Sequence, residues 1–267
     1  MRASVGAALR FVREEWRLVL LVAGIGAVAQ ALALAALGAT LSWPVAFLLI
    51  AIAGHAALTR ATLSGSARVQ LNLAGDTLRT LGCVAIVGLF AAIVFIVVLY
   101  LAMSALIAPY MEQAKAAGEN EAALRAVLET AIAAQPDLLR WIGLAGAVII
   151  FALTSRFFFA APLSIERGKV LAFQSWAATR GYLLKIMLAR FVLLAPALTL
   201  AGALQSIAGV GAGVPVGDPI LIIQRAFSNP LFWGALQFLQ IAVYGALEAS
   251  LSAHLYRRLA PAPQAGK

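Results

Sequence analysis

Four polar side chains near the C-terminal end of the chain are spaced so that they could do chemistry together. They are Gln237, Gln240, Tyr244 and Glu248, at positions i, i+3, i+7 and i+11. This spacing predicts one polar stripe on the face of a helix. His55, in another apolar stretch, could contact Glu248. A carboxylate and an imidazole can exchange protons, and amide and phenol groups can bind a polar solute.

Glu248 is the only acidic residue well inside a predicted membrane span. A polar stripe in a membrane is expected to face the bundle interior or a water-filled cavity, because exposing it to lipid is costly. One hypothesis is therefore a pathway for protons or a polar substrate. The alternative is an interhelical hydrogen-bond network, in which each bond contributes about 0.6 kcal/mol. One acid and one histidine make a small set for a proton relay, which favours the structural alternative.

A second group of candidate residues lies in the segment 156–190, which holds six of the chain's twenty lysines and arginines. Four of them could bind anionic lipid headgroups, namely Arg167, Lys169, Arg180 and Lys185. The alternative is that they only fix the orientation of the chain in the membrane. Pro162 and Ser164 predict the start of an interfacial helix here, with Trp176 at headgroup depth.

No motif in the sequence predicts an enzyme. The two histidines lack the partners of a Ser-His-Asp triad, and no HExxH zinc motif is present. The glycines at 209, 211 and 213 are not followed by the Lys-Ser or Lys-Thr pair of a phosphate-binding loop. The single cysteine, Cys83, excludes an intramolecular disulfide. We therefore expect no catalytic residue, no cofactor and no metal.

The composition of the chain indicates that these residues lie on membrane helices. Of the 267 residues, 63% are hydrophobic and only 12% are charged, whereas about a quarter of the residues of a soluble domain are charged. The net charge is +9, but the basic residues are spread between apolar runs. A nucleic-acid-binding protein gathers its basic residues on one soluble surface, so the pattern excludes that class.

Six apolar runs are long enough to cross a membrane as helices. The predicted spans are 18–37, 45–62, 81–108, 141–161, 186–210 and 231–256. Together they predict an all-α helical bundle with one transmembrane domain, 18–256. Residues 1–17 predict an amphipathic lead-in at the membrane surface, and residues 257–267 a cytoplasmic tail.

Two further predictions concern one loop segment and one charged side chain. The segment Met111–Asp137 carries an apolar face at helical spacing and predicts a further amphipathic helix on a surface. Arg190, near the start of the fifth run, is expected to extend its side chain to the membrane interface.

The basic residues also predict the orientation of the chain. With both termini on one side, that side holds all of the twenty lysines and arginines except Lys115, Arg125, Arg140 and Arg225. Cytoplasmic loops carry the excess of basic residues, so both termini are expected in the cytoplasm. This requires an even number of spans, which agrees with six.

The segment 156–190 also resembles a known family. The resemblance is carried by Pro162, Glu166, Gly168, Ala172, Ser175, Trp176, Thr179, Arg180, Gly181, Lys185 and Ile186. These residues resemble the signature of a superfamily of six-span bacterial membrane proteins. It is typified by the membrane domain of some glycerophosphoryl diester phosphodiesterases and by related uncharacterised inner-membrane proteins. The sequence LYRRL, Leu255–Leu259, is similar to the end of their last span.

The resemblance covers the second half of the chain well and the first half only in its order of spans. It implies a six-span fold in a bacterial inner membrane. It implies no catalytic residue, because the soluble phosphodiesterase domain fused to some members has no counterpart in these 267 residues.

A second resemblance is to the cytoplasmic coupling loop of ABC transporter permeases, the helix that docks on the ATPase. It is carried by Ala177, Ala178, Gly181, Leu194 and Pro196. The spacing departs from that motif, because Trp176 replaces its leading Glu and one residue is missing before the Gly.

Two functions remain from these observations. The first is a non-catalytic membrane-domain protein that interacts with membrane lipids, especially anionic ones, or with a protein partner. The second is a transporter or permease subunit that uses the polar stripe on the sixth span.

Overall fold

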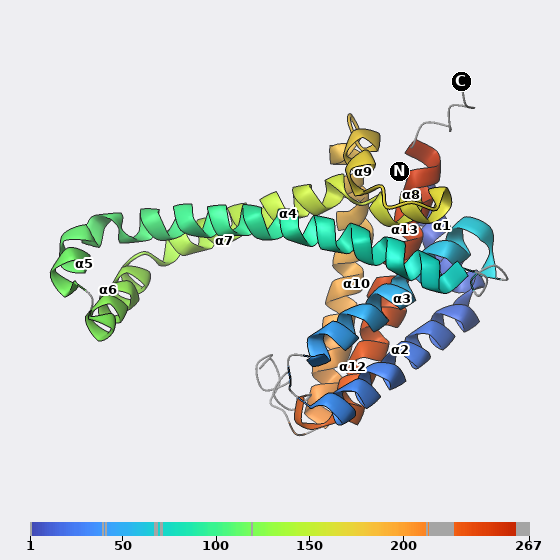
Figure 1. Cartoon of the computed structure of the whole chain (residues 1–267), viewed down its shortest axis with the longest axis horizontal. Helices are drawn as coiled ribbons and strands as arrows, with labels where there is room; N and C mark the ends of the chain where they lie inside the picture. The colour runs from blue at the N-terminus through green and yellow to red at the C-terminus, as the bar shows by residue number, and fades with distance from the viewer. Residues whose placement is uncertain are drawn as a thin grey trace. The chain divides into compact units, whose positions relative to one another are not determined.

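The computed structural model describes residues 2–38, 40, 42–66, 69, 72–118, 120–211, 213 and 227–259, except for the side chain of residue 139. All secondary structure in these ranges is helical, as Figure 1 shows. Six stretches there are long and apolar enough to cross a membrane: Trp16–Leu37, Ser42–Ser64, Leu73–Ala117, Pro136–Arg167, Leu183–Gly211 and Pro230–Leu259. Each contains one predicted span. The all-α prediction is confirmed, and the chain is a multi-span membrane protein by the length and composition of its helices.

The chain divides into two compact units. The first comprises Met1–Ala85 and Arg156–Lys267, and the second comprises Ile86–Ser155. The predicted tail at 257–267 belongs to the first unit, and its residues 260–267 lie outside the described residues. The helices of the first unit are α1 (Arg2–Glu14), α2 (Trp16–Leu37), α3 (Ser42–Ser64), the start of α4 (Leu73–Ile107), α8 (Ala160–Arg167), α9 (Ala172–Ala178), α10 (Leu183–Gly211), α12 (Pro230–Leu239), a π-helix (Gln240–Gly245) and α13 (Ala246–Leu259).

The packing of the first unit is centred on α2, α3 and α13. Helix α2 packs against both α3 and α12, and α13 packs against α3 and α1. The contact between α2 and α12 needs a glycine at 234, because a Cβ there would lie 3.1 Å from the carbonyl oxygen of Ala27 and 3.1 Å from the Cβ of Ala31. The absence of a side chain allows the two helices to approach closely, as small residues do in membrane helix pairs.

The predicted lead-in forms the helix α1, which is part of this packing. Its Ala8 is buried in the same apolar cluster as Phe159, Ile186 and Leu251. The helix therefore contributes one face to the core of the first unit. Its position relative to a membrane surface stays a prediction.

The segment after Arg156 differs from its prediction. Instead of one helix starting at Pro162, the chain forms α8 from Ala160 and then α9, with Gly168 between them in the left-handed region at φ +69°. Ser164 does not cap a helix start, because it lies within α8. Its hydroxyl accepts a hydrogen bond from the backbone N–H of Leu171 at 2.9 Å and so holds the connection to α9.

The second unit contains the remainder of α4 and most of α7 (Pro136–Arg156). Between them the chain forms a short 3-10 helix (Ala108–Tyr110), α5 (Met111–Ala117) and α6 (Glu121–Ala134), and α5 packs against α6. The single amphipathic helix predicted over Met111–Asp137 is thus two helices. Asn120 starts the second of them, because its side-chain oxygen accepts hydrogen bonds from the backbone N–H groups of Ala122 and Ala123.

Candidate functional site

A cavity of about 400 Å³ in the first unit is lined by residues of α2, α3, α4, α12, the π-helix and α13. All five residues of the predicted polar set line it, namely His55, Gln237, Gln240, Tyr244 and Glu248. The structure therefore brings together side chains that the sequence places almost 200 residues apart. The apolar part of the wall includes Phe47, Leu58, Val84 and Ile241.

The polar stripe passes through the π-helix formed by Gln240–Gly245. A π-helical turn takes up more residues than an α-helical turn, and such turns occur frequently at functional sites. Gln240 and Tyr244 lie within it, and both still face the cavity. No pattern in the sequence predicts this turn, because a single change of helical register leaves no periodic pattern.

Arg190 enters the first unit from α10 and pairs with Glu248. Its Nη2 lies 3.8 Å from Oε1 of Glu248, and the two side chains are 7% and 26% exposed. The guanidinium also lies over the ring of Phe158, 4.8 Å from the ring centre. Tyr244 interacts with both charged groups.

The prediction that Arg190 extends to the membrane interface is therefore wrong. The side chain turns inward, where a carboxylate and two aromatic rings surround it. A buried charge is stable only when it is paired, so an acid inside one span predicts a basic partner inside another span.

His55 lies on α3 and is half-buried. It interacts electrostatically with Glu248 and lines the same cavity. The two groups therefore line one cavity, and a direct contact between them stays a prediction.

Two further polar residues of the cavity wall were missed in the sequence. Gln30 of α2 and Thr80 of α4 both line the cavity, and each is 1% exposed. Neither side chain has a hydrogen-bond partner among the described residues. The signal for Gln30 was present, because it is the single side chain with hydrogen-bonding groups in the apolar run 18–37.

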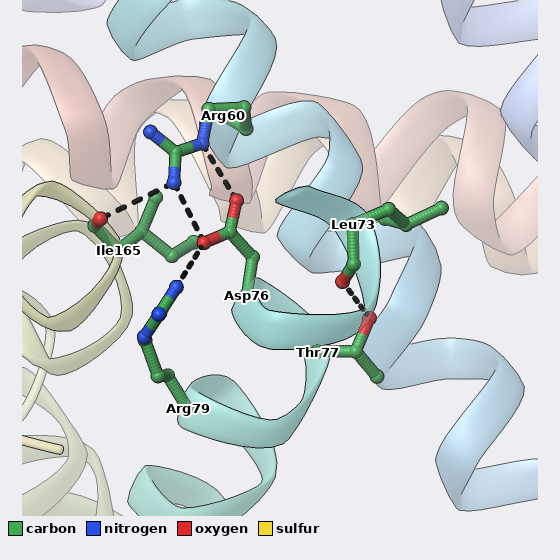
Figure 2. A network of polar contacts seen from close by, with 6 residues as sticks. All are labelled: Arg60, Leu73, Asp76, Thr77, Arg79 and Ile165. Carbon is green, nitrogen blue, oxygen red and sulfur yellow. Dashed lines mark hydrogen bonds and ion pairs between the residues drawn. The ribbon is translucent and has the colours of Figure 1, made fainter. Parts of the chain in front are cut away.

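A second buried polar cluster lies around Asp76, and Figure 2 shows its contacts. Arg60 donates from Nε to Oδ2 and from Nη2 to Oδ1, both at 2.6 Å, and Arg79 donates to Oδ1 at 2.9 Å. Arg60 Nη2 also donates to the carbonyl oxygen of Ile165 at 3.3 Å. The cluster joins α3, α4 and α8, and Asp76 itself is fully buried. Both carboxylate oxygens accept hydrogen bonds from arginines, so the charge of this acid is already paired within the protein.

The four candidate lipid contacts separate into two pairs. Arg167 and Arg180 line one pocket of about 530 Å³ in the first unit, whereas Lys169 and Lys185 do not line it. All four side chains are exposed. The remaining wall of this basic pocket consists of Leu163, Gln174, Ala177, Ala178, Tyr182 and Leu259.

Hydrogen bonds between the end of α7 and α9 position the pocket. The Ser175 hydroxyl donates to the carbonyl oxygen of Arg156 at 3.0 Å and accepts from the N–H of Phe159 at 3.1 Å. The Thr179 hydroxyl donates to the same carbonyl oxygen at 3.1 Å. These bonds fix the helix that precedes Arg180, because Ser175 and Thr179 are both buried.

Over the described ranges, no group of three or more His, Cys, Asp or Glu side chains could hold a metal ion. Comparisons of the chain with family models, with curated proteins and with solved structures gave no match.

Proposed function

We propose that the protein is a bacterial inner-membrane protein that binds the headgroup of an anionic phospholipid in the pocket of Arg167 and Arg180. The observation that carries this proposal is that two arginines line one pocket whose other walls are mostly apolar. Arginine suits a phosphate group because its planar fork can donate two parallel hydrogen bonds. The apolar wall offers contacts for the first carbons of an acyl chain.

The location of the pocket at the ends of two candidate membrane spans supports a lipid as its ligand. Two candidate membrane spans end at residues of its wall, one at Arg167 and the other at Leu259. The ends of membrane spans lie near the level of the headgroups. A headgroup could therefore reach the two arginines while its acyl chains stay in the bilayer.

Exposed aromatic side chains beside the pocket also favour this location. Phe173 and Trp176 of α9 are 62% and 42% exposed, and the guanidinium of Arg156 lies 5.4 Å from the ring centre of Trp176. Aromatic and basic residues together are typical of the membrane–water interface. This supports α9 as an interfacial helix.

The test compares two double variants with equal changes of charge. In Arg167→Gln/Arg180→Gln, we expect retention of phosphatidylglycerol to fall about tenfold or more, because each charge-assisted hydrogen bond contributes about 1.5–3 kcal/mol. In Lys169→Gln/Lys185→Gln, which leaves the pocket intact, we expect a loss of less than about threefold, as long-range attraction alone would give. Native mass spectrometry from mixed phosphatidylcholine and phosphatidylglycerol nanodiscs measures both. Equal losses in the two variants would refute a defined headgroup site.

The polar cavity supports a second candidate function, proton-linked transport of a polar solute. The observation that favours it is that His55, Tyr244 and Glu248 line one cavity. We expect Glu248→Gln to abolish dye-detected proton flux in proteoliposomes, while Glu129→Gln at an exposed position has no effect. Unchanged flux in Glu248→Gln would remove this candidate. Absence of proton flux from the native protein would also remove this candidate.

The proposed orientation places both termini in the cytoplasm, as the distribution of basic residues and the resemblance to six-span bacterial proteins imply. Single cysteines introduced into a Cys83→Ala background test it. We expect a membrane-impermeant thiol reagent to label Lys115→Cys in intact cells and to label Lys169→Cys only after the cells are opened. The opposite pattern would reverse the orientation.

A further inference from the structure

Gln30 is the most unusual side chain in the polar cavity. It lies on α2 within the otherwise apolar run 18–37, it is 1% exposed, and it lines the cavity. Both its amide nitrogen and its amide oxygen are buried, and neither has a hydrogen-bond partner among the described residues. Buried polar groups are nearly always satisfied, so each exception needs an explanation.

A second unsatisfied group lies in the wall of the same cavity. The hydroxyl of Thr80, on α4, is buried and has no partner within the described part of the chain. Gln30 and Thr80 come from different helices, but both belong to the lining of one space. Two independent side chains thus leave hydrogen-bonding capacity at the cavity that none of the described residues uses.

The chemistry of the wall defines the class of molecule that fits. An amide presents a donor and an acceptor side by side, and a hydroxyl is both at one atom. Gln237, Gln240 and Tyr244 add groups of the same kind. The carboxylate of the wall, Glu248, is paired with Arg190, so it offers little attraction to a cationic ligand. The cavity therefore favours a neutral ligand with several hydroxyl groups.

We infer that this cavity binds a small uncharged polyol or sugar, and that the Gln30 amide is its principal recognition group. Hydroxyl groups of the ligand can both accept from and donate to the amide, while its C–H groups contact Phe47, Leu58 and Ile241. The volume of about 400 Å³ lies within the range of about 300–1,000 Å³ that is usual for small-molecule sites. The inference deepens the second candidate function by naming a solute class. It does not require transport, so binding without flux would leave it standing.

The experiment measures equilibrium binding of radiolabelled xylitol and sorbitol to the full chain in phosphatidylcholine nanodiscs. We expect saturable binding of at least one of them, competition by the other, and no competition by the charged analogue gluconate. In Gln30→Met, which keeps the length of the side chain and removes both hydrogen-bonding groups, we expect affinity to fall at least tenfold. The absence of saturable binding by the native protein would overturn the inference.

Gln205→Met is the matched control. Gln205 belongs to α10, does not line the cavity, and donates from its amide to the carbonyl oxygen of Leu236 at 3.3 Å. We expect this variant to bind the polyol as the native protein does. An equal loss in the two variants would contradict a role for Gln30, and so would native affinity in Gln30→Met.

A stability measurement separates lost binding from lost folding. Without a ligand, Gln30→Met should unfold no more easily than the native protein, because the amide that it removes has no hydrogen-bond partner in the described part of the chain. Reduced stability of ligand-free Gln30→Met would show that the amide has a structural role and would overturn the inference.

Discussion

The Asp76 cluster and the polar cavity are both buried polar regions of the first unit, but they differ in how their hydrogen bonds are satisfied. Asp76 receives three hydrogen bonds from two arginines, at 2.6–2.9 Å. At the cavity, Glu248 lies 3.8 Å from Arg190 of α10, and the side chains of Gln30 and Thr80 have no hydrogen-bond partner among the described residues. One region is saturated, whereas the other keeps hydrogen-bonding capacity.

This difference separates a structural role from a binding role. A saturated cluster contributes to folding, since removal of one member leaves buried charges unpaired. An unsatisfied cluster contributes little to folding of the free protein, because its groups make few bonds. It can instead gain bonds from a ligand. We therefore expect similar substitutions to lower the free energy of unfolding strongly in the Asp76 cluster and very little in the cavity.

The largest effect is expected at Asp76. In Asp76→Asn the shape is kept but the charge is lost, so that the partly buried guanidinium groups of Arg60 and Arg79 lie beside a neutral group in place of a carboxylate. We expect the free energy of unfolding to fall by about 3–5 kcal/mol. Unfolding in mixed micelles of dodecyl sulfate and dodecyl maltoside measures it. The control is Asp137→Asn, whose exposed pair with Arg140 should contribute less than about 1 kcal/mol. Equal stability of the two variants would contradict a structural role for Asp76.

Two buried serines extend the comparison to uncharged groups. Ser175→Ala leaves the buried N–H of Phe159 without its acceptor, and we expect a loss of about 1–3 kcal/mol. Ser250, equally buried, has no partner within the described ranges. For Ser250→Ala we expect a change within about 0.5 kcal/mol. The same unfolding assay measures both. A larger loss of stability in Ser250→Ala than in Ser175→Ala would show that the effect of a substitution does not depend on whether the side chain has a hydrogen-bond partner.

A smaller effect is expected from the pair of Arg190 and Glu248. A double-mutant cycle of Arg190→Gln and Glu248→Gln should give a coupling energy of about 1 kcal/mol, because the 3.8 Å separation is long and Glu248 is partly exposed. Unfolding of the native protein, both single variants and the double variant supplies the four values. A coupling energy near zero would show that the two charges do not stabilise each other.

The smallest effect is expected at Thr80. In Thr80→Val the unpartnered hydroxyl is replaced by a methyl group of similar size, so the free energy of unfolding should change by less than about 0.5 kcal/mol. Polyol binding should weaken in the same variant. A clear loss of stability would show that the Thr80 hydroxyl contributes to folding, as the Asp76 cluster does, and would contradict the proposed difference between the two regions.

Regular patterns along the chain predicted much of this architecture. Apolar length identified the six spans, and helical periodicity identified four of the residues that line the cavity. The missing features depend on contacts between helices. Arg60 and Asp76 are 16 residues apart and Arg190 and Glu248 lie on different helices, so no local spacing reveals either pair.

Local backbone changes also escaped prediction. The break at Gly168 and the π-helix at Gln240–Gly245 each change the direction or register of a helix within a few residues. Gln30 could have been noticed as a lone amide in an apolar run. Its lack of partners could be recognised only once its neighbours in space were known.

The most direct test compares ligand-free Gln30→Met with Asp76→Asn in one unfolding assay. Each substitution replaces a buried polar group by a close match in shape. We expect the free energy of unfolding to fall by about 3–5 kcal/mol in Asp76→Asn and to stay unchanged or rise in Gln30→Met. A loss of similar size in both variants would contradict the claim that one region holds the fold together and the other is kept open for a ligand.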